Sequence, residues 1–393
     1  MSAVQPLPAT ETQRVSTFDA LGRVLAEAVR SGLDVPPADN TSMDGYALRC
    51  ADVLATGILL PVSQRIPAGV VGAPLRPGSA ARIFTGAQVP AGADAVVMQE
   101  QCEAEGDGVR VNTIPHPGQW IRRRGEDVRQ GSEVLPAGTR LTPQALGLAA
   151  TVGAATLCVA PRPRVALFST GDELAMPGEP LKPGAIYNSN RFTLRALIQA
   201  LGCECTDLGL VPDRLDATRA ALRQAAQGNH LIVTSGGVSV GDEDHLRPAV
   251  AAEGRIDLWQ IAIKPGKPLA FGQVQRADQS AAYFIGLPGN PVSSFITFLL
   301  VVRPVLLRLQ GGTDLSPGSV SLRADFDWPQ PDQRREFLRV RRNPQGGLDL
   351  FPNQSSGVLT STVWADGVVD NPSGHVIRRG DAVTCLLFSE LLS

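Results

Sequence analysis

The chain has 393 residues, which is too long for one ordinary hydrophobic core and predicts roughly two to four domains. Hydrophobic residues make up 43% and charged residues 19%, a balance that favours a globular chain over a disordered one. Lys and Arg number 36 against 38 Asp and Glu, so the formal net charge of -2 gives no support to nucleic-acid binding.

The longest apolar run, FITFLLVV at 295–302, falls well short of the about 18 residues that a membrane-spanning helix needs. The N-terminal stretch MSAVQPLPATETQR lacks the basic start and apolar block of a secretory signal. The 6 cysteines and 4 histidines show neither zinc-ligand nor disulfide spacing. We therefore expect no membrane association, and a cytoplasmic location.

The first region, residues 1–163, mixes two patterns. The stretch STFDALGRVLAEAVRSGLD, at 16–34, predicts an amphipathic helix with Ser16 as cap. A second helix is expected after Thr142. Glycines and prolines punctuate the short apolar segments between them, which predicts a β-rich module at about 50–134. That module is inserted into a helical linking part at about 1–49 and 135–163.

From 164 to 310, expected strands alternate with expected helices, which predicts an α/β domain with a doubly wound, mainly parallel sheet. Asp216 is expected to cap one helix, and Asn290, followed by Pro291, to begin another. Short apolar segments separated by Gly, Pro and Asn then fill 316–393, which predicts a small C-terminal β-barrel.

Glycine-rich strings follow the expected strands of the central region, where open α/β sheets bind ligands. Glycines let backbone N–H groups approach an anion, and a following helix N-terminus favours negative charge. A single Gly-Gly pair is explained by a turn between two elements. Several such loops at one edge of a sheet instead indicate a phosphate site. The loops are STGDEL (169–174), PDR (212–214), SGGVSVGDED (235–244) and GLPGNP (286–291).

Acidic residues in these loops would repel a phosphate unless a cation lay between them. Mg²⁺ takes oxygen ligands, commonly one or two carboxylates with phosphate oxygens and water. Glu173, Asp213 and Asp244 therefore indicate a Mg²⁺–phosphate site. Asp242 and Glu243 are equally well explained as acids near the start of the following helix.

Basic and polar groups of the opposite character lie in other loops. Lys264 and Lys267 stand in the proline-bounded turn KPGKP, which restricts them and favours an anion-binding role over plain solvated surface. In the inserted region, Arg82 and Thr85 carry the donors that an oxyanion needs. Asp44 is either functional or a turn carboxylate, and the arginine run at 122–124 is as readily a solvated face.

Eight strings, taken in order, resemble the molybdopterin molybdenumtransferases, also called MoeA or molybdenum insertases, to which the C-terminal domain of gephyrin is related. The resemblance runs from about residue 10 to the C-terminus. Each string alone is weak, but eight in order are specific: SMDGYA, FTGAQVPAGADAVV, RRRGEDV, STGDEL, NSNRFTL, TSGGVSVGDED, AIKPGKP and GLPGNPVS.

The resemblance implies a transferase that inserts molybdate into adenylylated molybdopterin. Mg²⁺-dependent cleavage of the pyrophosphate would give molybdenum cofactor and AMP. It also implies a homodimer whose active site forms between the central domain of one subunit and the inserted module of the other. The adenylyltransferase and downstream molybdoenzyme maturation factors are the further partners that it suggests.

Carried over motif by motif, the resemblance implies roles for residues in every region. The catalytic set comprises Asp44, Thr85, Asp127, Glu173, Asp213, Asp244, Lys264 and Lys267, and among these Glu173, Asp213 and Asp244 would surround the Mg²⁺. The binding set comprises Ser235, Gly236, Gly237, Ser239, Gly241, Asp242, Pro288, Gly289, Asn290, Pro291, Ser355 and Ser356.

Two positions depart from the family pattern. Gln260 stands where many relatives have a basic residue, and Arg214 follows Asp213 where many bacterial members have a second acid. Two alternatives remain: the sibling adenylyltransferase, which resembles the central domain alone, and a non-catalytic pterin-binding scaffold. The long flanks argue against the first, and the retained charges of Asp44, Glu173 and Lys264 argue against the second.

Overall fold

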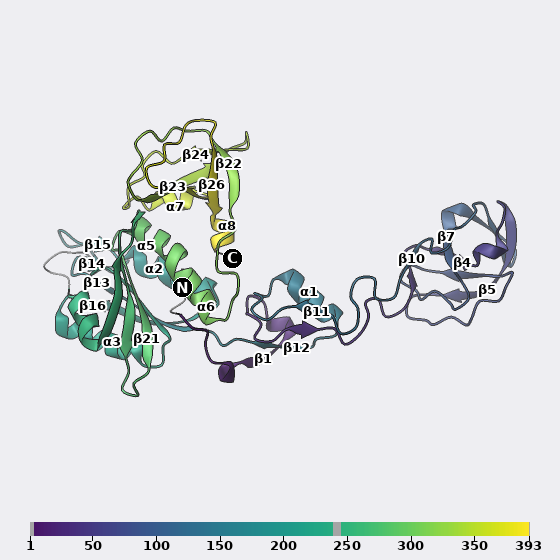
Figure 1. Cartoon of the computed structure of the whole chain (residues 1–393), viewed down its shortest axis with the longest axis horizontal. Helices are drawn as coiled ribbons and strands as arrows, with labels where there is room; N and C mark the ends of the chain where they lie inside the picture. The colour runs from purple at the N-terminus through teal and green to yellow at the C-terminus, as the bar shows by residue number, and fades with distance from the viewer. Residues whose placement is uncertain (1–3, 239–244, 393) are drawn as a thin grey trace.

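The computed structural model describes residues 4–238 and 245–392. The chain is elongated, with a bulky part at one end that holds the central sheet and the C-terminal barrel (Figure 1). A narrow link leads from it to a β-rich module at the opposite end. Four predicted binding or catalytic residues lie outside the described residues: Ser239, Gly241, Asp242 and Asp244.

The amphipathic helix expected over residues 16–34 is wrong. The segment forms a single 3-10 turn, η2 (Thr17–Asp19), and otherwise extended backbone. Its apolar residues do not share one buried face, because Phe18 is 94% exposed while Leu25 is 2% exposed. Helical spacing alone cannot stabilise a helix whose apolar stripe has no surface to pack against.

The link is built instead from short antiparallel pairs and one helix. The pairs are β1 (Gln13–Ser16) with β12 (Thr156–Val159), and β2 (Val29–Arg30) with β11 (Glu133–Leu135). The second expected helix is present as α1 (Pro143–Thr151). Thr142 Oγ1 accepts a hydrogen bond from the Ala145 backbone N–H at 3.2 Å, as expected of an N-cap.

The module contains a six-stranded sheet in the order β7-β4-β6-β5-β9-β8. Apolar clusters lie on both of its faces. The sequence places the start of the module at about residue 50. Because β4 belongs to this sheet, the module begins before that residue. The strands are β4 (Gly45–Leu48), β5 (Ile58–Ile66), β6 (Ala80–Ile83), β7 (Ala95–Met98), β8 (Cys102–Glu105) and β9 (Gly108–Val111), with β3 (Asn40–Thr41) and β10 (Ile121–Arg122) paired at its base.

The central sheet has the order β16-β13-β17-β21-β20-β18. The first four strands are parallel, and β20 alone runs antiparallel to both of its neighbours, β21 and β18, which confirms a mainly parallel sheet. The strands are β13 (Arg164–Thr170), β16 (Glu204–Val211), β17 (Leu231–Ser235), β18 (Gly254–Gln260), β20 (Pro268–Gln275) and β21 (Ala281–Leu287), with a small pair, β14 (Leu174–Ala175) and β15 (Ile186–Tyr187), beside it.

Helices cover both faces of this sheet, as a doubly wound domain requires. One face packs against α2 (Ser189–Ala200), α5 (Pro291–Thr297) and α6 (Arg303–Leu309), and the other against α3 (Leu215–Ala226) and α4 (Leu246–Glu253). A π-helical segment, η5 (Phe298–Val302), joins α5 to α6. By length and composition alone, Pro291–Leu309 could cross a membrane, but 78% of its most apolar window is buried inside the protein, as in a core helix.

Two expected helix caps differ from the structure. Asp216 is not an N-cap, because α3 begins at Leu215 and places Asp216 in the first turn. There its carboxylate lies 3.7 Å from Arg214 Nε. Asn290 does precede α5, and Pro291 takes the first position, but the Asn290 side chain makes no capping hydrogen bond.

The C-terminal region is a small closed β-barrel, as expected. A final pairing between β23 and β25 closes the sheet on itself. One strand comes from outside: β19 (Ile263–Lys264), in the KPGKP segment, adds in parallel to β23. The barrel elements are β22 (Val320–Ala324), β23 (Arg335–Arg342), β24 (Gly347–Leu350), β25 (Gly367–Asn371) and β26 (Ala382–Leu387), with α7 (Thr360–Trp364) and α8 (Phe388–Leu391).

Candidate functional site

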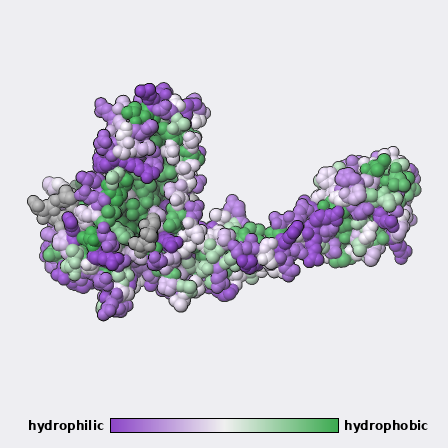
Figure 2. Space-filling view, in the orientation of Figure 1, coloured by the Kyte–Doolittle hydropathy of each residue, from purple (hydrophilic) through white to green (hydrophobic). Residues whose placement is uncertain are grey.

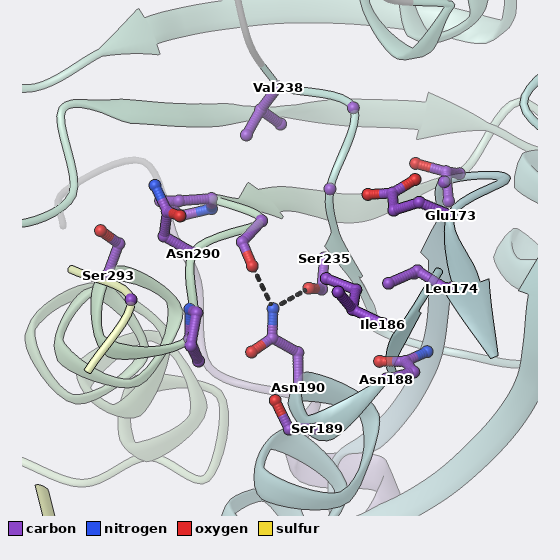
Figure 3. A pocket seen from close by; sticks show the side chains of 18 of the residues that line it. Glu173, Leu174, Ile186, Asn188, Ser189, Asn190, Ser235, Val238, Asn290 and Ser293 are labelled. Atoms are coloured by element: carbon purple, nitrogen blue, oxygen red, sulfur yellow. Dashed lines mark hydrogen bonds between the residues drawn. The ribbon is translucent and has the colours of Figure 1, made fainter. Parts of the chain in front are cut away.

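A cavity of about 610 Å³ lies at the carboxyl ends of β13, β17 and β21 and at the first turns of α2 and α5 (Figure 3). Parallel strands end at one edge, so loops far apart in sequence meet there. The cavity brings together nine of the predicted site residues: Glu173, Asp213, Ser235, Gly236, Gly237, Pro288, Gly289, Asn290 and Pro291.

Two glycines let the loop after β17 pack against the end of β13. Gly236 has φ +92°, and a Cβ there would lie 2.5 Å from the Thr170 carbonyl oxygen. Gly237 has φ +65°, and its Cβ would lie 2.8 Å from Thr170 Oγ1. Any other residue at these two positions would have a strained backbone and a clashing Cβ. The two glycines therefore allow the backbone of this loop to line the cavity.

Asn190 is a cavity residue that the sequence analysis did not select. Its side chain, 8% exposed, donates to Ser235 Oγ at 2.8 Å and to the Gly289 carbonyl at 2.7 Å (Figure 3). One amide thus joins the first turn of α2 to the loops after β17 and β21. The string NSNRFTL carried the available signal, because a polar residue in the first turn of a helix after a strand commonly faces a ligand site.

Glu173 and Asp213 both line the cavity and are its acidic side chains among the described residues. Gly171, at φ +139°, gives room to the Glu173 carboxylate, because a Cβ at that glycine would lie 2.5 Å from Oε2. The described part of the chain holds no group of three or more His, Cys, Asp or Glu arranged for a metal. Two carboxylates facing a cavity with room for phosphate oxygens and water nevertheless fit the ligand preference of Mg²⁺.

Lys264 lies at the junction with the barrel and does not line this cavity. Its Nζ is 3.3 Å from Asp332 Oδ2 and 3.2 Å from Glu336 Oε1. Glu336 is 1% exposed, and its other oxygen accepts a hydrogen bond from Trp328 Nε1 at 2.8 Å. Hydrogen bonds from Arg334, and to a lesser degree from Lys264, hold the pKa of Asp332 well below its usual range.

Three predicted residues of this half remain: Ser355, whose carbonyl accepts a hydrogen bond from Arg339 Nη2 at 3.2 Å, Ser356 and Lys267. Lys267 lines a second cavity, of about 560 Å³, together with Gln260 and Arg334. The departure from the family pattern at Gln260 therefore sits beside a predicted functional lysine. Of the NQSSG loop, the Ser356 carbonyl accepts a hydrogen bond from the Val292 backbone N–H at 3.0 Å, and the following glycine, Gly357, lines the main cavity.

Asp44 and Thr85 form a contact of their own on the module. Asp44 Oδ1 accepts hydrogen bonds from the Thr85 backbone N–H at 2.8 Å and from its hydroxyl at 2.7 Å. These bonds hold the pKa of Asp44 below its ordinary value. Because β4 lies at the opposite end of the molecule from α5 and β21, one chain does not bring this pair to the cavity (Figure 1).

The last predicted residue, Asp127, lies near the link, where its backbone N–H donates to the Val35 carbonyl at 3.0 Å. The neighbouring arginine run is largely explained by structure. Arg123 pairs with Asp39 at 2.7 Å and Arg124 with Asp34 at 2.6 Å, while both arginine side chains remain more than half exposed.

The comparisons with known proteins cover the same three regions. The chain matches the MoeA N-terminal region (domain I and II) over residues 1–153 and the probable molybdopterin binding domain over 166–308. It matches the MoeA C-terminal region (domain IV) over 321–388. The order of the three matches follows the order of link with module, central sheet and barrel along the chain.

Full-length relatives agree with these matches. A molybdopterin molybdenumtransferase of Haemophilus influenzae is 44% identical over 399 residues, which cover 98% of this chain and 96% of the relative. Another, of Nostoc sp., is 40% identical over 388 residues, which cover 96% and 88%. The crystal structure of a molybdopterin biosynthesis moeA protein from Pyrococcus horikoshii has a TM-score of 0.84 at 29% identity, over 98% of this chain and 96% of that one. The chain therefore belongs to the molybdopterin molybdenumtransferase (MoeA) family.

Proposed function

We propose that the chain inserts molybdenum into molybdopterin, taking adenylylated molybdopterin and molybdate as substrates and releasing molybdenum cofactor and AMP. The full-length relatives carry the name of this transferase, and the chain is a transferase of the same kind. The observation that carries the proposal is the cavity in which the glycine loop after β17 faces Glu173 and Asp213. A sibling adenylyltransferase is not favoured, since the relatives match the flanks as well.

Different groups of the cavity would bind the phosphate oxygens and the metal ion, and another would hold the loops in place. The backbone at Gly237 and at the start of α2 would offer N–H groups to phosphate oxygens, while the Gly236 N–H already donates to the Leu287 carbonyl at 3.2 Å. Glu173 and Asp213 would hold Mg²⁺, and that ion, when bound, neutralises charge on a pyrophosphate. Asn190 fixes the relative positions of the three loops through its two hydrogen bonds, so the groups are oriented before substrate arrives.

A homodimer would complete the site. Asp44 and Thr85 lie on the module, at the far end of the chain from the cavity, so a second copy must deliver them if both act on one substrate. Figure 2 shows hydrophobic residues gathered on the visible face of the bulky part, between the central sheet and the barrel, a surface suited to being covered. A C2 dimer would supply two equivalent shared sites.

The cell compartment and further partners follow from the same proposal. All 6 cysteines are free, as expected of a protein in the reducing cytoplasm. Contact with the enzyme that adenylylates molybdopterin would pass the substrate on directly, and contact with molybdoenzyme maturation factors would do the same for the product.

The test is a turnover assay with adenylylated molybdopterin, molybdate and Mg²⁺. AMP is measured by chromatography, and cofactor by activation of a molybdoenzyme apoprotein. We expect both products, and neither from a Glu173→Gln variant. Formation of adenylylated pterin from molybdopterin and ATP, without cofactor, would show the adenylyltransferase instead.

A further inference from the structure

One face of the module carries a row of alternating cations and aromatic rings. The register pairs Tyr46 of β4 with Arg82 of β6, and Arg82 with Arg65 of β5, so the three side chains lie across one face of the sheet. Phe84 follows Arg82 by two residues and projects to the same side. We call Tyr46, Arg82, Phe84 and Arg65 the ladder.

The rungs of the ladder stack on one another. The Arg82 guanidinium carbon lies 5.1 Å from the Tyr46 ring centroid and 4.7 Å from that of Phe84. The Arg65 guanidinium carbon lies 4.7 Å from the same Phe84 ring. Phe84 is thus held by two cations, and stacked guanidinium groups keep their flat faces ordered.

Within the described part of the chain, no ion pair neutralises the positive charge of the ladder, although the charge of Arg82 helps to keep the pKa of Asp44 low. Arg82 donates to two neutral acceptors, the Gly45 carbonyl at 3.1 Å and Gln99 Oε1 at 2.6 Å. Among the described residues, neither Arg82 nor Arg65 lies within salt-bridge distance of a carboxylate, whereas Arg110 of the same module pairs with Glu105 at 2.6 Å. An unneutralised pair of cations on aromatic faces complements a flat, anionic ligand.

The ladder is continuous with the Asp44–Thr85 contact. The antiparallel register that pairs Gly45 with Ile83 sets Asp44 across from Phe84. Thr85 follows Phe84 directly and donates to the Asp44 carboxylate. A ligand packed against the edge of Phe84 would therefore lie beside the pair that the family resemblance places in the active site.

We propose that the ladder binds a phosphate-bearing aromatic ring, one half of adenylylated molybdopterin, and positions it beside Asp44 and Thr85. This proposal rests on the proposed function and adds a binding surface to it. Arg65 and Arg82 contact the phosphate oxygens, and the aromatic ring of the ligand packs against the edge of Phe84 between them. The ligand is bound on its other side by the cavity of a second copy.

The test uses the full-length protein and two probes, AMP and a phosphorylated pterin, titrated by calorimetry. The variants are Arg65→Ala, Phe84→Leu and Arg82→Lys, the last of which keeps the charge but loses the flat stacking group. The control is Arg76→Gln, which removes an equal charge from an exposed position before the other end of β6. Thermal unfolding of each variant checks that the module is intact.

We expect each ladder variant to weaken binding roughly fivefold to tenfold, with a shallower salt dependence for Arg65→Ala and no change for Arg76→Gln. Weaker binding of AMP assigns the ladder to the adenylyl half, and weaker binding of the phosphorylated pterin assigns it to the other. Failure of both probes to bind, or equal affinity across all variants, overturns the ladder proposal. In the turnover assay, AMP release by the wild type shows that the proposed function stands regardless of that outcome, and its absence shows that the function itself fails.

Discussion

Asn190 donates a hydrogen bond from its side-chain amide to Ser235 Oγ at 2.8 Å, and this contact ties the first turn of α2 to the end of β17. The same nitrogen donates to the Gly289 carbonyl at 2.7 Å, so the loop before α5 is held as well. Three loops that line the cavity thus depend on one buried amide.

Replacing Asn190 by Ala should loosen the cavity. The change leaves a buried hydroxyl and a buried carbonyl without their donor, so the free energy of unfolding should fall by about 1–3 kcal/mol. The KM for adenylylated molybdopterin should rise more than kcat falls, because the loops lose their orientation. Urea unfolding and steady-state AMP release measure the two effects, with Gln199→Ala, an exposed amide at the other end of α2, as the matched control. An unchanged KM would show that the loops hold without this amide.

Lys264→Ala should affect both stability and turnover. Glu336 would remain buried without its cation, which lowers the free energy of unfolding by about 1–3 kcal/mol. If Lys264 also binds an anion, AMP release under subsaturating molybdate should drop roughly tenfold to a hundredfold.

The double variant Lys264→Ala with Glu336→Gln separates these roles, because it removes the stranded charge as well. We expect its thermal stability to recover while its turnover stays low. Recovery of turnover together with stability would mean that the lysine acts only as the partner of Glu336 and Asp332, against our prediction of an anion-binding role.

Thr85→Val should shift the pH dependence of turnover. The hydroxyl of Thr85 helps to keep the pKa of Asp44 low, so its loss raises that pKa. Asp44 would then be protonated at a higher pH as the solution is acidified, and the acid limb of the kcat/KM profile should move to higher pH. Thr85→Ser keeps the hydroxyl and should retain the wild-type profile. Identical pH profiles for the wild type, Thr85→Val and Thr85→Ser would show that the ionisation of Asp44 does not limit the reaction.

Turnover should require Mg²⁺. Chelation should abolish AMP release, and Asp213→Asn should raise the Mg²⁺ concentration needed for half-maximal rate by roughly tenfold or more, since a carboxylate ligand becomes a neutral amide. Glu103→Gln removes an exposed acid from the module and serves as the control. Full activity after chelation would contradict a metal role for Glu173 and Asp213.

Stability should fall on mild acidification because of His230. Burial, helped by the charges of Arg164 and Arg276, lowers the pKa of His230 to about 4. The unfolded state, with an ordinary histidine pKa, binds more protons between those two values. The contribution is therefore complete above about pH 6.5 and is lost as the pH falls toward 4.

Thermal melts at pH 7 and pH 5 measure this effect. The wild type should lose about 1 kcal/mol, given the partial exposure of the ring, and His230→Gln should lose less. Equal losses in the two proteins would assign the acid sensitivity to other groups.

The sequence predicted the central domain well because its signals are local. Ile232 and Val233 are both 0% exposed, because their strand is buried on both faces. A continuous apolar run of this kind predicts a buried strand from the sequence alone. The helix predicted over residues 16–34 is absent because Phe18 and Leu21 have helical spacing but no surface to pack on. Periodicity reports what a segment could bury, and only the fold provides the partner.

Some residues of the candidate site could likewise be predicted from the sequence, and others could not. Glu173 and Gly236 were predictable because the end of a parallel strand is readable from sequence, and strand ends converge. The contacts of Lys264 were not, because they depend on β19 joining the barrel next to β23. Asn190 was missed since its role depends on two loops whose meeting is a tertiary property.

The central claim is that the cavity of one copy and the Asp44–Thr85 contact of another form one site, and subunit mixing tests it most directly. Asp44→Ala and Glu173→Gln, each inactive alone, are denatured together, refolded and assayed for AMP release. Random pairing in a C2 dimer predicts recovery of about a quarter of wild-type activity, because half of the dimers regain one intact site. A mixture as inactive as its two components, with mixed dimers demonstrated by differently tagged subunits, would contradict a shared site.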